Sequence, residues 1–316
     1  MYNFNHLYYF YITVKSDGVT AAAKHLRISQ PSLSGQLKVL EENIQTKLFR
    51  KVGRKNELTK EGSIIFGFCR KMFELSEEME ESITEKIPHV SRRINIGVSV
   101  EIANSFLVEV ISHFLGKFNE RLRPKITMIT ESHEKLSELL RFREIDVIVS
   151  PFNMTDPDLE NLQQLEVPVN LICTKNKVKI NNTRQRKDSI LNILNSYYKG
   201  KHAQWVMPST GLKLRTEINQ FAEENNLKGR TVFESDVIES LTRSIVDSIG
   251  ISFLPLIYVA KELENKVVES YGPKDGFWKY KIGLSCHVKS KDDHLISELS
   301  KSLLDICKPV VKKKKS

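Results

Sequence analysis

The sequence predicts an α/β protein with an N-terminal winged helix-turn-helix, a long linker helix and two α/β subdomains. Three observations lead to this prediction. Two short helical patterns meet across a tight connection in residues 18–41, and a longer helical pattern with a narrow apolar stripe follows in residues 60–85. From residue 94 onward, strand-like and helical patterns alternate, which is typical of a parallel α/β sheet.

Length and charge agree with this organisation. The 316 residues, of which 40% are hydrophobic, can form two or three domains with proper cores. The formal net charge of +9 suits a polyanionic partner. Positive charge is concentrated in residues 24–60, whereas residues 61–90 are rich in glutamate. This contrast predicts a DNA-facing unit followed by a unit that stays off the DNA.

Export, membrane insertion and disulfide bonding are not indicated. The sequence has no apolar run of membrane-spanning length, and residues 1–7 lack a basic region ahead of an apolar stretch. The cysteines are scattered and form no CxxC motif: Cys69, Cys173, Cys286 and Cys307. We therefore expect buried, reduced thiols in a cytoplasmic protein, and a redox-sensing pair is the alternative.

The first helix is predicted over residues 4–15. Leu7, Phe10, Tyr11 and Val14 share one side of it. An aromatic stripe at helical spacing indicates core packing rather than a binding site. We expect this helix to form the third wall of a trihelical core.

The second helix of the helix-turn-helix has a clear start. Ser29 can cap it, and Pro31 falls in the first turn, where a missing N–H group does no harm. Leu33, Leu37 and Leu40 turn inward. The outward face then carries hydrogen-bonding side chains: Gln30, Ser32, Ser34, Gln36 and Lys38. Such side chains read base edges and phosphates, although an ordinary two-helix corner is the alternative.

Residues 47–59 follow as two short extended pieces around a basic turn that contains glycine. This pattern indicates a wing, a hairpin that lies against the DNA backbone or the minor groove, whereas the alternative is a solvated loop. We predict base contacts from Gln30, Pro31, Ser32 and Ser34. We predict phosphate contacts from Arg27, Lys38, Arg50, Arg54 and Lys55. Two recognition helices related by symmetry would read half-sites roughly 34 Å apart or a multiple of it.

Thr59 is predicted to cap a long helix that ends near Glu85. Its apolar residues follow a heptad seam: Ile65, Phe68, Met72, Leu75 and Met79. Because a narrow stripe cannot be buried by one helix alone, we expect dimerisation through this helix. Packing against the trihelical core is the alternative.

The remaining chain forms two α/β series. The first is predicted to have strands over 94–98, 125–130 and 145–150, with helices over 102–118 and 134–142. The second is predicted to have strands over 204–207, 231–234 and 250–255, with helices over 212–225 and 237–248. Residues 165–175 carry the chain across, a strand over 279–288 returns it, and a helix over 294–307 closes the structure. Residues 176–203 show no clear pattern.

Ligands of such folds bind at the carboxyl ends of the strands, where helix N-termini point inward. The residues at these ends are the candidate effector contacts: Ser99, Val100, Ser132, His133, Phe152, Ser209, Thr210 and Asp236. Free N–H groups and hydroxyls favour a small anion, whereas Glu131 and Asp236 would suit a cation or an amine. Helix capping is the alternative role of Ser132 and Ser209.

These patterns divide the chain into a DNA-binding domain, a linker and dimerisation helix, an effector-binding domain and a basic tail, over residues 1–60, 61–90, 91–308 and 309–316. Subdomain I covers about 91–164 and 266–308, and subdomain II about 165–265. The sequence lacks GxSxG, HExxH, P-loop and GxGxxG motifs, so we expect no enzyme, catalytic residue, metal site or cofactor. A periplasmic solute-binding protein would have no use for residues 1–60.

Five motifs carry a family resemblance: Thr20–Ala23 with Leu26, Ser29–Ser34, Leu40–Glu42, Leu48–Arg50 and Leu58–Gly62. With these motifs the chain resembles the LysR-type transcriptional regulators. The resemblance implies a winged helix-turn-helix, a dimerising linker helix and an effector domain like a periplasmic binding protein. It also implies a dimeric or tetrameric regulator that binds double-stranded DNA, responds to a small effector or ion and, as an activator, works with RNA polymerase.

Residues 5–10, 35–36, 47–49, 71–76 and 131–134 resemble, within this family, a sodium-responsive activator of a transport gene. A response to Na⁺ is therefore one hypothesis. A two-lobe binding protein with nonspecific DNA contact is the alternative function. The chain departs from many members in two ways: Gly35 replaces a basic residue, and Gln45 and Thr46 stand where a glycine is common. We expect these departures to change base specificity and the approach to the wing.

Overall fold

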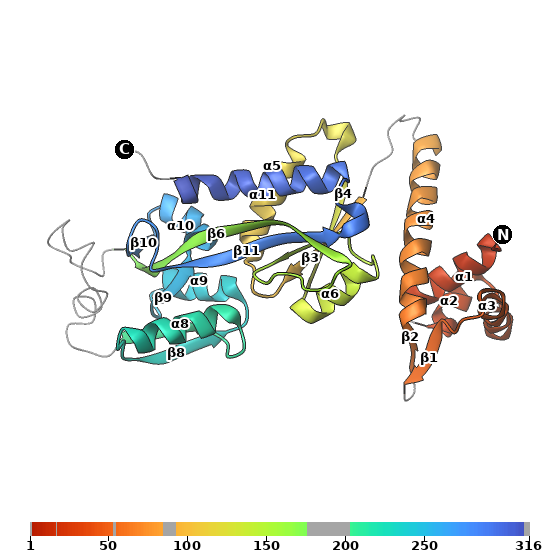
Figure 1. The fold of residues 1–316 in the computed structure, drawn as a ribbon, viewed down its shortest axis with the longest axis horizontal. Helices are drawn as coiled ribbons and strands as arrows, with labels where there is room; N and C mark the ends of the chain where they lie inside the picture. The colour runs from red at the N-terminus through yellow and green to blue at the C-terminus, as the bar shows by residue number, and fades with distance from the viewer. Residues whose placement is uncertain (1, 17, 53–54, 85–92, 176–202, 313–316) are drawn as a thin grey trace. The chain divides into compact units, whose positions relative to one another are not determined.

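The computed structural model describes residues 2–16, 18–52, 55–84, 93–175 and 203–312 (Figure 1). They group into two compact units. The first unit comprises Met1–Asn95, Asn119–Thr127 and Glu138–Asp146, and the second comprises Ile96–Phe118, Met128–Ser137 and Val147–Ser316. Within the described residues, no helix combines the length and the apolar character needed to span a membrane.

The N-terminal helices confirm the predicted trihelical core. They are α1 (Phe4–Lys15), α2 (Val19–Leu26) and α3 (Gln30–Ile44). Their inward faces are buried as the apolar spacing predicts: Leu7, Phe10, Tyr11, Ala22, Ala23, Leu33, Leu37 and Leu40. The alanines of α2 leave little bulk between the backbones, so that α3 can pack closely against it.

The predicted hairpin follows α3 as an antiparallel pair, β1 (Phe49–Val52) and β2 (Lys55–Leu58). The helix α4 (Lys60–Thr84) comes next, and its predicted cap is present because the Thr59 hydroxyl accepts the N–H of Gly62 at 2.9 Å.

The predicted apolar seam of α4 divides into two groups. Ile65 and Met72 pack against the trihelical core, as the alternative interpretation held. Phe68, Leu75 and Met79 are 51%, 61% and 57% exposed. These three side chains are therefore available to a partner helix.

The first α/β series contains β3 (Arg93–Ser99), α5 (Asn104–Leu115), β4 (Lys125–Glu131), α6 (His133–Arg141) and β5 (Val147–Ser150). Strands β3 and β5 are parallel, as predicted. Two long antiparallel strands, β6 (Leu159–Thr174) and β11 (Trp278–His287), lie side by side and carry the chain out and back (Figure 1). The sequence predicted both connecting segments, although β6 begins at Leu159 rather than at the predicted residue 165.

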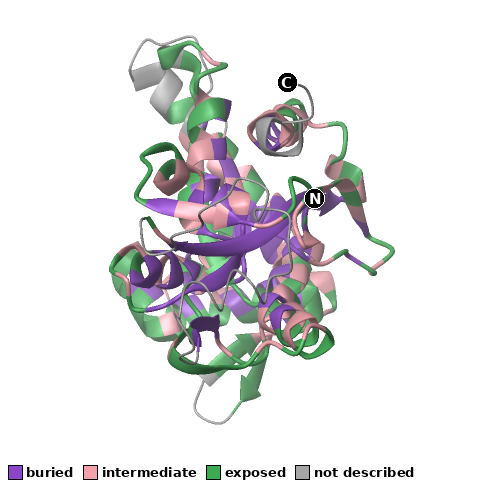
Figure 2. Ribbon diagram, turned by 90° about the vertical axis from the view of Figure 1, so that its left-hand side faces the viewer, coloured by how far each residue is buried: buried purple, intermediate pink, exposed green. Residues whose placement is uncertain are grey.

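The second series contains β7 (Ala203–Pro208), α8 (Lys213–Glu224), β8 (Gly229–Ser235), α9 (Ile238–Val246) and β9 (Ser252–Pro255). Strands β7 and β8 are parallel, whereas β9 joins the large sheet by pairing with β6. With β10 (Val268–Tyr271), the order of that sheet in the described residues is β10-β6-β11-β5-β3-β4. Figure 2 shows buried residues along its strands.

Several short elements were not predicted, among them the 3-10 turn Leu256–Val259, α10 (Ala260–Glu264) and β10 (Val268–Tyr271). Elements of four or five residues are too short to show a periodicity. The closing helix α11 (His294–Lys312) runs past its predicted end at Cys307, into the segment expected to be a tail. The unassigned segment 176–202 and residues 313–316 lie outside the described residues.

Candidate DNA-binding and effector sites

The recognition helix α3 begins as its sequence predicts. Ser29 has an extended backbone, and its hydroxyl accepts the N–H of Ser32 at 3.3 Å, while Pro31 lies in the first turn. Because Leu33 and Leu40 are buried on the opposite side, the polar side chains between them are held facing outward.

The predicted base contacts Gln30, Pro31, Ser32 and Ser34 are all exposed on α3. Among the predicted phosphate contacts, Arg27, Lys38 and Arg50 are exposed. Lys38 lies 3.8 Å from Glu42, and Arg50 lies 3.4 Å from Glu57. Exposed ion pairs of this kind are weak, so a phosphate can replace the carboxylate. Arg54 and the side chain of Lys55 lie outside the described residues.

A hollow of about 410 Å³ joins the recognition helix to the wing. Gln30 and Ser34 of α3 line it together with Thr20 at the start of α2 and Asn56 of β2. Sequence reasoning did not select Thr20 and Asn56 as candidate contacts, although Thr20 belongs to the motif that carries the family resemblance. These side chains border the same concave surface as the predicted base contacts.

Glu41 connects the recognition helix to the wing. Its carboxylate accepts the N–H groups of Leu48 at 2.9 Å and Phe49 at 3.4 Å, and the Lys47 ammonium lies 2.6 Å away. Burial opposes the ionisation of Glu41, but these hydrogen bonds outweigh it and hold its pKa below the usual 4.5. The carboxylate thereby holds the start of β1 against α3.

The two departures from the family pattern have structural consequences. Gln45 ends α3 in the left-handed conformation, at φ 54°, which glycine adopts without strain. Gly35 is exposed, and a Cβ placed there would meet no atom within 4 Å. Any side chain at position 35 would therefore project into open space.

The candidate effector residues of the first series lie at the predicted strand ends. Ser99 is buried and Val100 is exposed. The Nδ1 atom of His133 lies 3.1 Å from the Ser150 hydroxyl, and its ring centroid lies 4.9 Å from that of Phe152. Burial lowers the pKa of His133, which favours the neutral ring.

Three of the remaining four candidates form hydrogen bonds within the protein. Ser132 accepts the N–H of Lys135 at 3.3 Å, which is the capping role weighed as its alternative. The N–H of Ser209 donates to Ser235, and the N–H of Thr210 donates to Glu234. Asp236 is exposed.

Sequence reasoning missed a buried carboxylate of this region, Glu101. Glu101 is 4% exposed and lies two residues past the end of β3. Its Oε2 atom lies 2.7 Å from the backbone nitrogen of Lys213, at the start of α8. Burial raises the pKa of Glu101 despite its hydrogen bonds.

Lys213 also contacts one predicted candidate, Phe152. Its ammonium donates to the carbonyl of Pro151 at 2.7 Å and lies 5.3 Å from the ring centroid of Phe152 and 5.6 Å from that of Tyr280. The predicted edge of the sheet therefore gathers an acid, a base and two aromatic rings.

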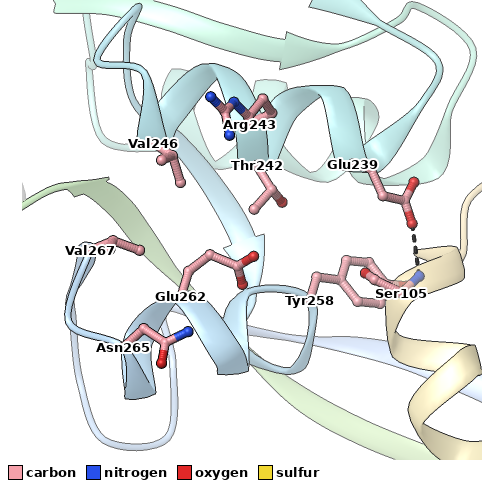
Figure 3. Close-up of a pocket in the computed structure, with 9 residues that line it drawn as sticks. All are labelled: Ser105, Glu239, Thr242, Arg243, Val246, Tyr258, Glu262, Asn265 and Val267. Atoms are coloured by element: carbon pink, nitrogen blue, oxygen red, sulfur yellow. Dashed lines mark hydrogen bonds between the residues drawn. The ribbon is translucent and has the colours of Figure 1, made fainter.

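A hollow of about 290 Å³ lies between α9 and α10 (Figure 3). Its lining includes Glu239, Thr242, Tyr258 and Glu262. None of the predicted effector residues lines this hollow, because it opens beside the helices rather than at the strand ends.

The four cysteines are free and buried, as predicted. Burial raises the pKa of Cys69 and Cys307 to about 12 and that of Cys286 to about 11, and it raises the pKa of Cys173 as well. Because the thiolate is the reactive form, these thiols have little of the reactivity that a redox-sensing pair would need.

Comparison with known proteins agrees with this arrangement. The model of the family "Bacterial regulatory helix-turn-helix protein, lysR family" matches residues 4–63. The regulator BudR of Klebsiella aerogenes is 38% identical over 100 residues, which are 32% of this chain and 67% of BudR. The transcriptional activator NhaR of Escherichia coli is 30% identical over 176 residues, covering 54% of this chain and 57% of NhaR. The chain thus matches little more than half of NhaR's length.

A full-length OxyR variant from Pseudomonas aeruginosa has the same fold, with a TM-score of 0.62, 17% identity and coverage of 98% of this chain and 97% of that chain. A winged helix-turn-helix followed by two α/β series is the architecture that the two proteins share. This chain belongs to the LysR family of bacterial transcription regulators. The relatives are named as regulators, which agrees with the prediction that the chain is not an enzyme.

Proposed function

We propose that this protein is a sequence-specific DNA-binding regulator of transcription. The exposed polar face of α3, held outward by the buried Leu33 and Leu40, is the observation that carries the proposal. Its Gln30, Ser32 and Ser34 side chains have the donors and acceptors that base edges require. The phosphate-binding charges are Arg27, Lys38, Arg50, Arg54 and Lys55.

The regulator acts as a homodimer or tetramer in the cytoplasm, with RNA polymerase as its further partner when it activates. The exposed apolar side chains of Phe68, Leu75 and Met79 on α4 support self-association. Dimerisation through α4 would place two recognition helices on a palindromic site.

The strand ends of the two α/β series form the effector site in this proposal. Its contacts include Ser99, His133, Phe152, Ser209 and Asp236, all at the carboxyl ends of strands. The finer hypothesis of a Na⁺ response rests on the 30% identity with NhaR. Titration of Na⁺ at constant ionic strength, with promoter output as the readout, tests it, and an equal effect of K⁺ would eliminate it.

Footprinting of the purified protein upstream of its own gene and the divergent neighbour tests the proposed function. The DNA would be probed with competitor at about 50 and about 200 mM salt. We expect a protected, near-palindromic site that survives competitor. Protection without a defined site, lost as salt rises, would instead favour a two-lobe binding protein with nonspecific DNA contact.

A further inference from the structure

Helices α5 and α8 of the second unit are among those that begin without a side-chain cap. The residue before α5 is Ala103, the residue before α8 is Leu212, and neither side chain can accept a hydrogen bond. The first N–H groups of a helix have no acceptor within the helix, so they need one from elsewhere. In both cases a glutamate from the opposite α/β series supplies it.

Glu101, which follows β3, caps α8. Its Oε2 atom accepts the N–H groups of Lys213 at 2.7 Å and Leu214 at 3.3 Å. The hydroxyl of Tyr280 donates to the same oxygen at 3.3 Å, and the hydroxyl of Tyr258 donates to the backbone carbonyl of Glu101 at 3.2 Å. Glu101 therefore has donors from three separate parts of the chain.

Glu239, on α9, caps α5 in the opposite direction. Its Oε1 atom accepts the N–H of Ser105 at 3.0 Å, beside the hollow between α9 and α10 (Figure 3). Each series thus supplies a glutamate whose carboxylate caps a helix of the other series. These two contacts couple the series through side chains of the protein itself.

The start of α8 is where a small anionic effector would bind, because the N–H groups and the helix dipole attract negative charge there. That position already holds a carboxylate. The ammonium of Lys213 is occupied as well, since it donates to Pro151 and lies 4.0 Å from Glu217. An incoming anion would have to displace Glu101 from its hydrogen bonds.

We propose that Glu101 is a built-in ligand of the α8 N-terminus and determines which effectors the proposed effector site accepts. It excludes carboxylate effectors from this position, so the effector is uncharged or cationic where it meets α8. This statement of effector class rests on the proposed effector-binding function. The capping role of Glu101 does not.

Removal of the Glu101 side chain should convert the site into a receptor for free carboxylates. Glu101→Ala deletes a CH2–COO⁻ group, which acetate matches in size and charge. We expect the full-length variant to melt below the wild type, and about 100 mM sodium acetate to raise its midpoint by roughly 3 to 6 °C over the same concentration of NaCl. The wild type should show no difference between the two salts.

Glu234→Ala is the matched control. Glu234 also accepts an N–H group, that of Thr210 at 3.2 Å, but its carboxylate is exposed and pairs with Arg215. Acetate should leave the melting of this variant unchanged. Acetamide, which has no charge, should fail to rescue Glu101→Ala. An equal acetate shift in wild type and Glu101→Ala, or no loss of stability in Glu101→Ala, would overturn the proposal.

A second variant keeps the test decisive if Glu101→Ala does not fold. Leu212→Asp gives α8 a cap of its own, so the double variant should fold, melt above Glu101→Ala and no longer respond to acetate. Failure of the double variant to fold would contradict the capping role. Because melting involves no DNA, a negative footprint would disprove the proposed function while leaving this result intact.

Discussion

Glu41 and Glu101 both accept backbone N–H groups, but they do so in regions of very different construction. Glu41 joins the recognition helix to the wing, and its carboxylate serves residues seven and eight positions along the chain. Glu101 joins the two α/β series, and its partners lie 112 and 113 positions away. Burial is outweighed by hydrogen bonds at Glu41, whose pKa falls, whereas burial dominates at Glu101, whose pKa rises. Local hydrogen bonds therefore favour the ionised form of Glu41, whereas desolvation disfavours the ionised form of Glu101.

The largest effect is expected at the distant junction. Glu101→Ala leaves the N–H groups of Lys213 and Leu214 and the hydroxyl of Tyr280 without their acceptor in a buried site, so we expect a loss of roughly 2–3 kcal/mol in the free energy of unfolding. Urea unfolding of the full chain measures it. A loss below that of an exposed control, Glu224→Ala, would show that the junction contributes nothing.

A smaller loss, about 1–2 kcal/mol, is expected for Glu41→Ala, because its two hydrogen bonds to Leu48 and Phe49 are only partly buried. Amide hydrogen exchange at these two residues provides the local readout. Glu42→Ala, an exposed neighbour, is the control. Unchanged exchange at Leu48 in Glu41→Ala would mean that another group positions the wing.

The same contrast explains how far sequence reasoning reached. The start of α3 was predicted because Ser29 and Pro31 lie within a few residues of the groups that they serve. The strand-end rule also selected Ser99 and Phe152, which lie at or just past the ends of β3 and β5, but their contact with an effector stays a prediction. It missed Glu101 because its partners follow at sequence separations of 112 to 179, which no periodicity records.

The predicted apolar seam of α4 illustrates a second limit of prediction from sequence. Heptad spacing grouped Ile65 and Met72 with Phe68, Leu75 and Met79, although the structure packs the first two against the trihelical core. Spacing identifies an apolar stripe, but it does not say which neighbour covers each residue. The role of the three exposed side chains in dimerisation stays a prediction.

Opposite pH dependences should distinguish the two glutamates. A lowered pKa means that Glu41 contributes stability above pH 4.5 that is lost as the pH falls through its folded pKa. A raised pKa means that the part of the Glu101 contribution linked to protonation is complete below pH 4.5 and is lost as the pH rises through its folded pKa, while the capping hydrogen bonds remain. The melting temperature of the wild type minus that of Glu41→Gln should therefore rise with pH. The corresponding difference for Glu101→Gln should fall with pH. Parallel slopes would contradict the comparison.

The smallest effect concerns the open position on the recognition helix. Because a Cβ at Gly35 meets no atom, Gly35→Ala should stabilise α3 by about 0.5–1 kcal/mol. Gly35→Arg should in addition bind all DNA more tightly and steepen the salt dependence by about one unit. Urea unfolding and binding at several salt concentrations measure the two effects. Destabilisation by Gly35→Ala would mean that the position is not open.

The most direct test of the central claim, that the exposed face of α3 reads DNA sequence, compares Ser34→Ala with Lys38→Ala on specific and random DNA by fluorescence anisotropy. The wild type should prefer the specific site by at least about 10³-fold. Ser34→Ala should reduce that preference about tenfold, whereas Lys38→Ala should weaken both DNAs alike and flatten the salt dependence by about one unit. A wild-type preference near one, or equal losses of preference in the two variants, would contradict the account.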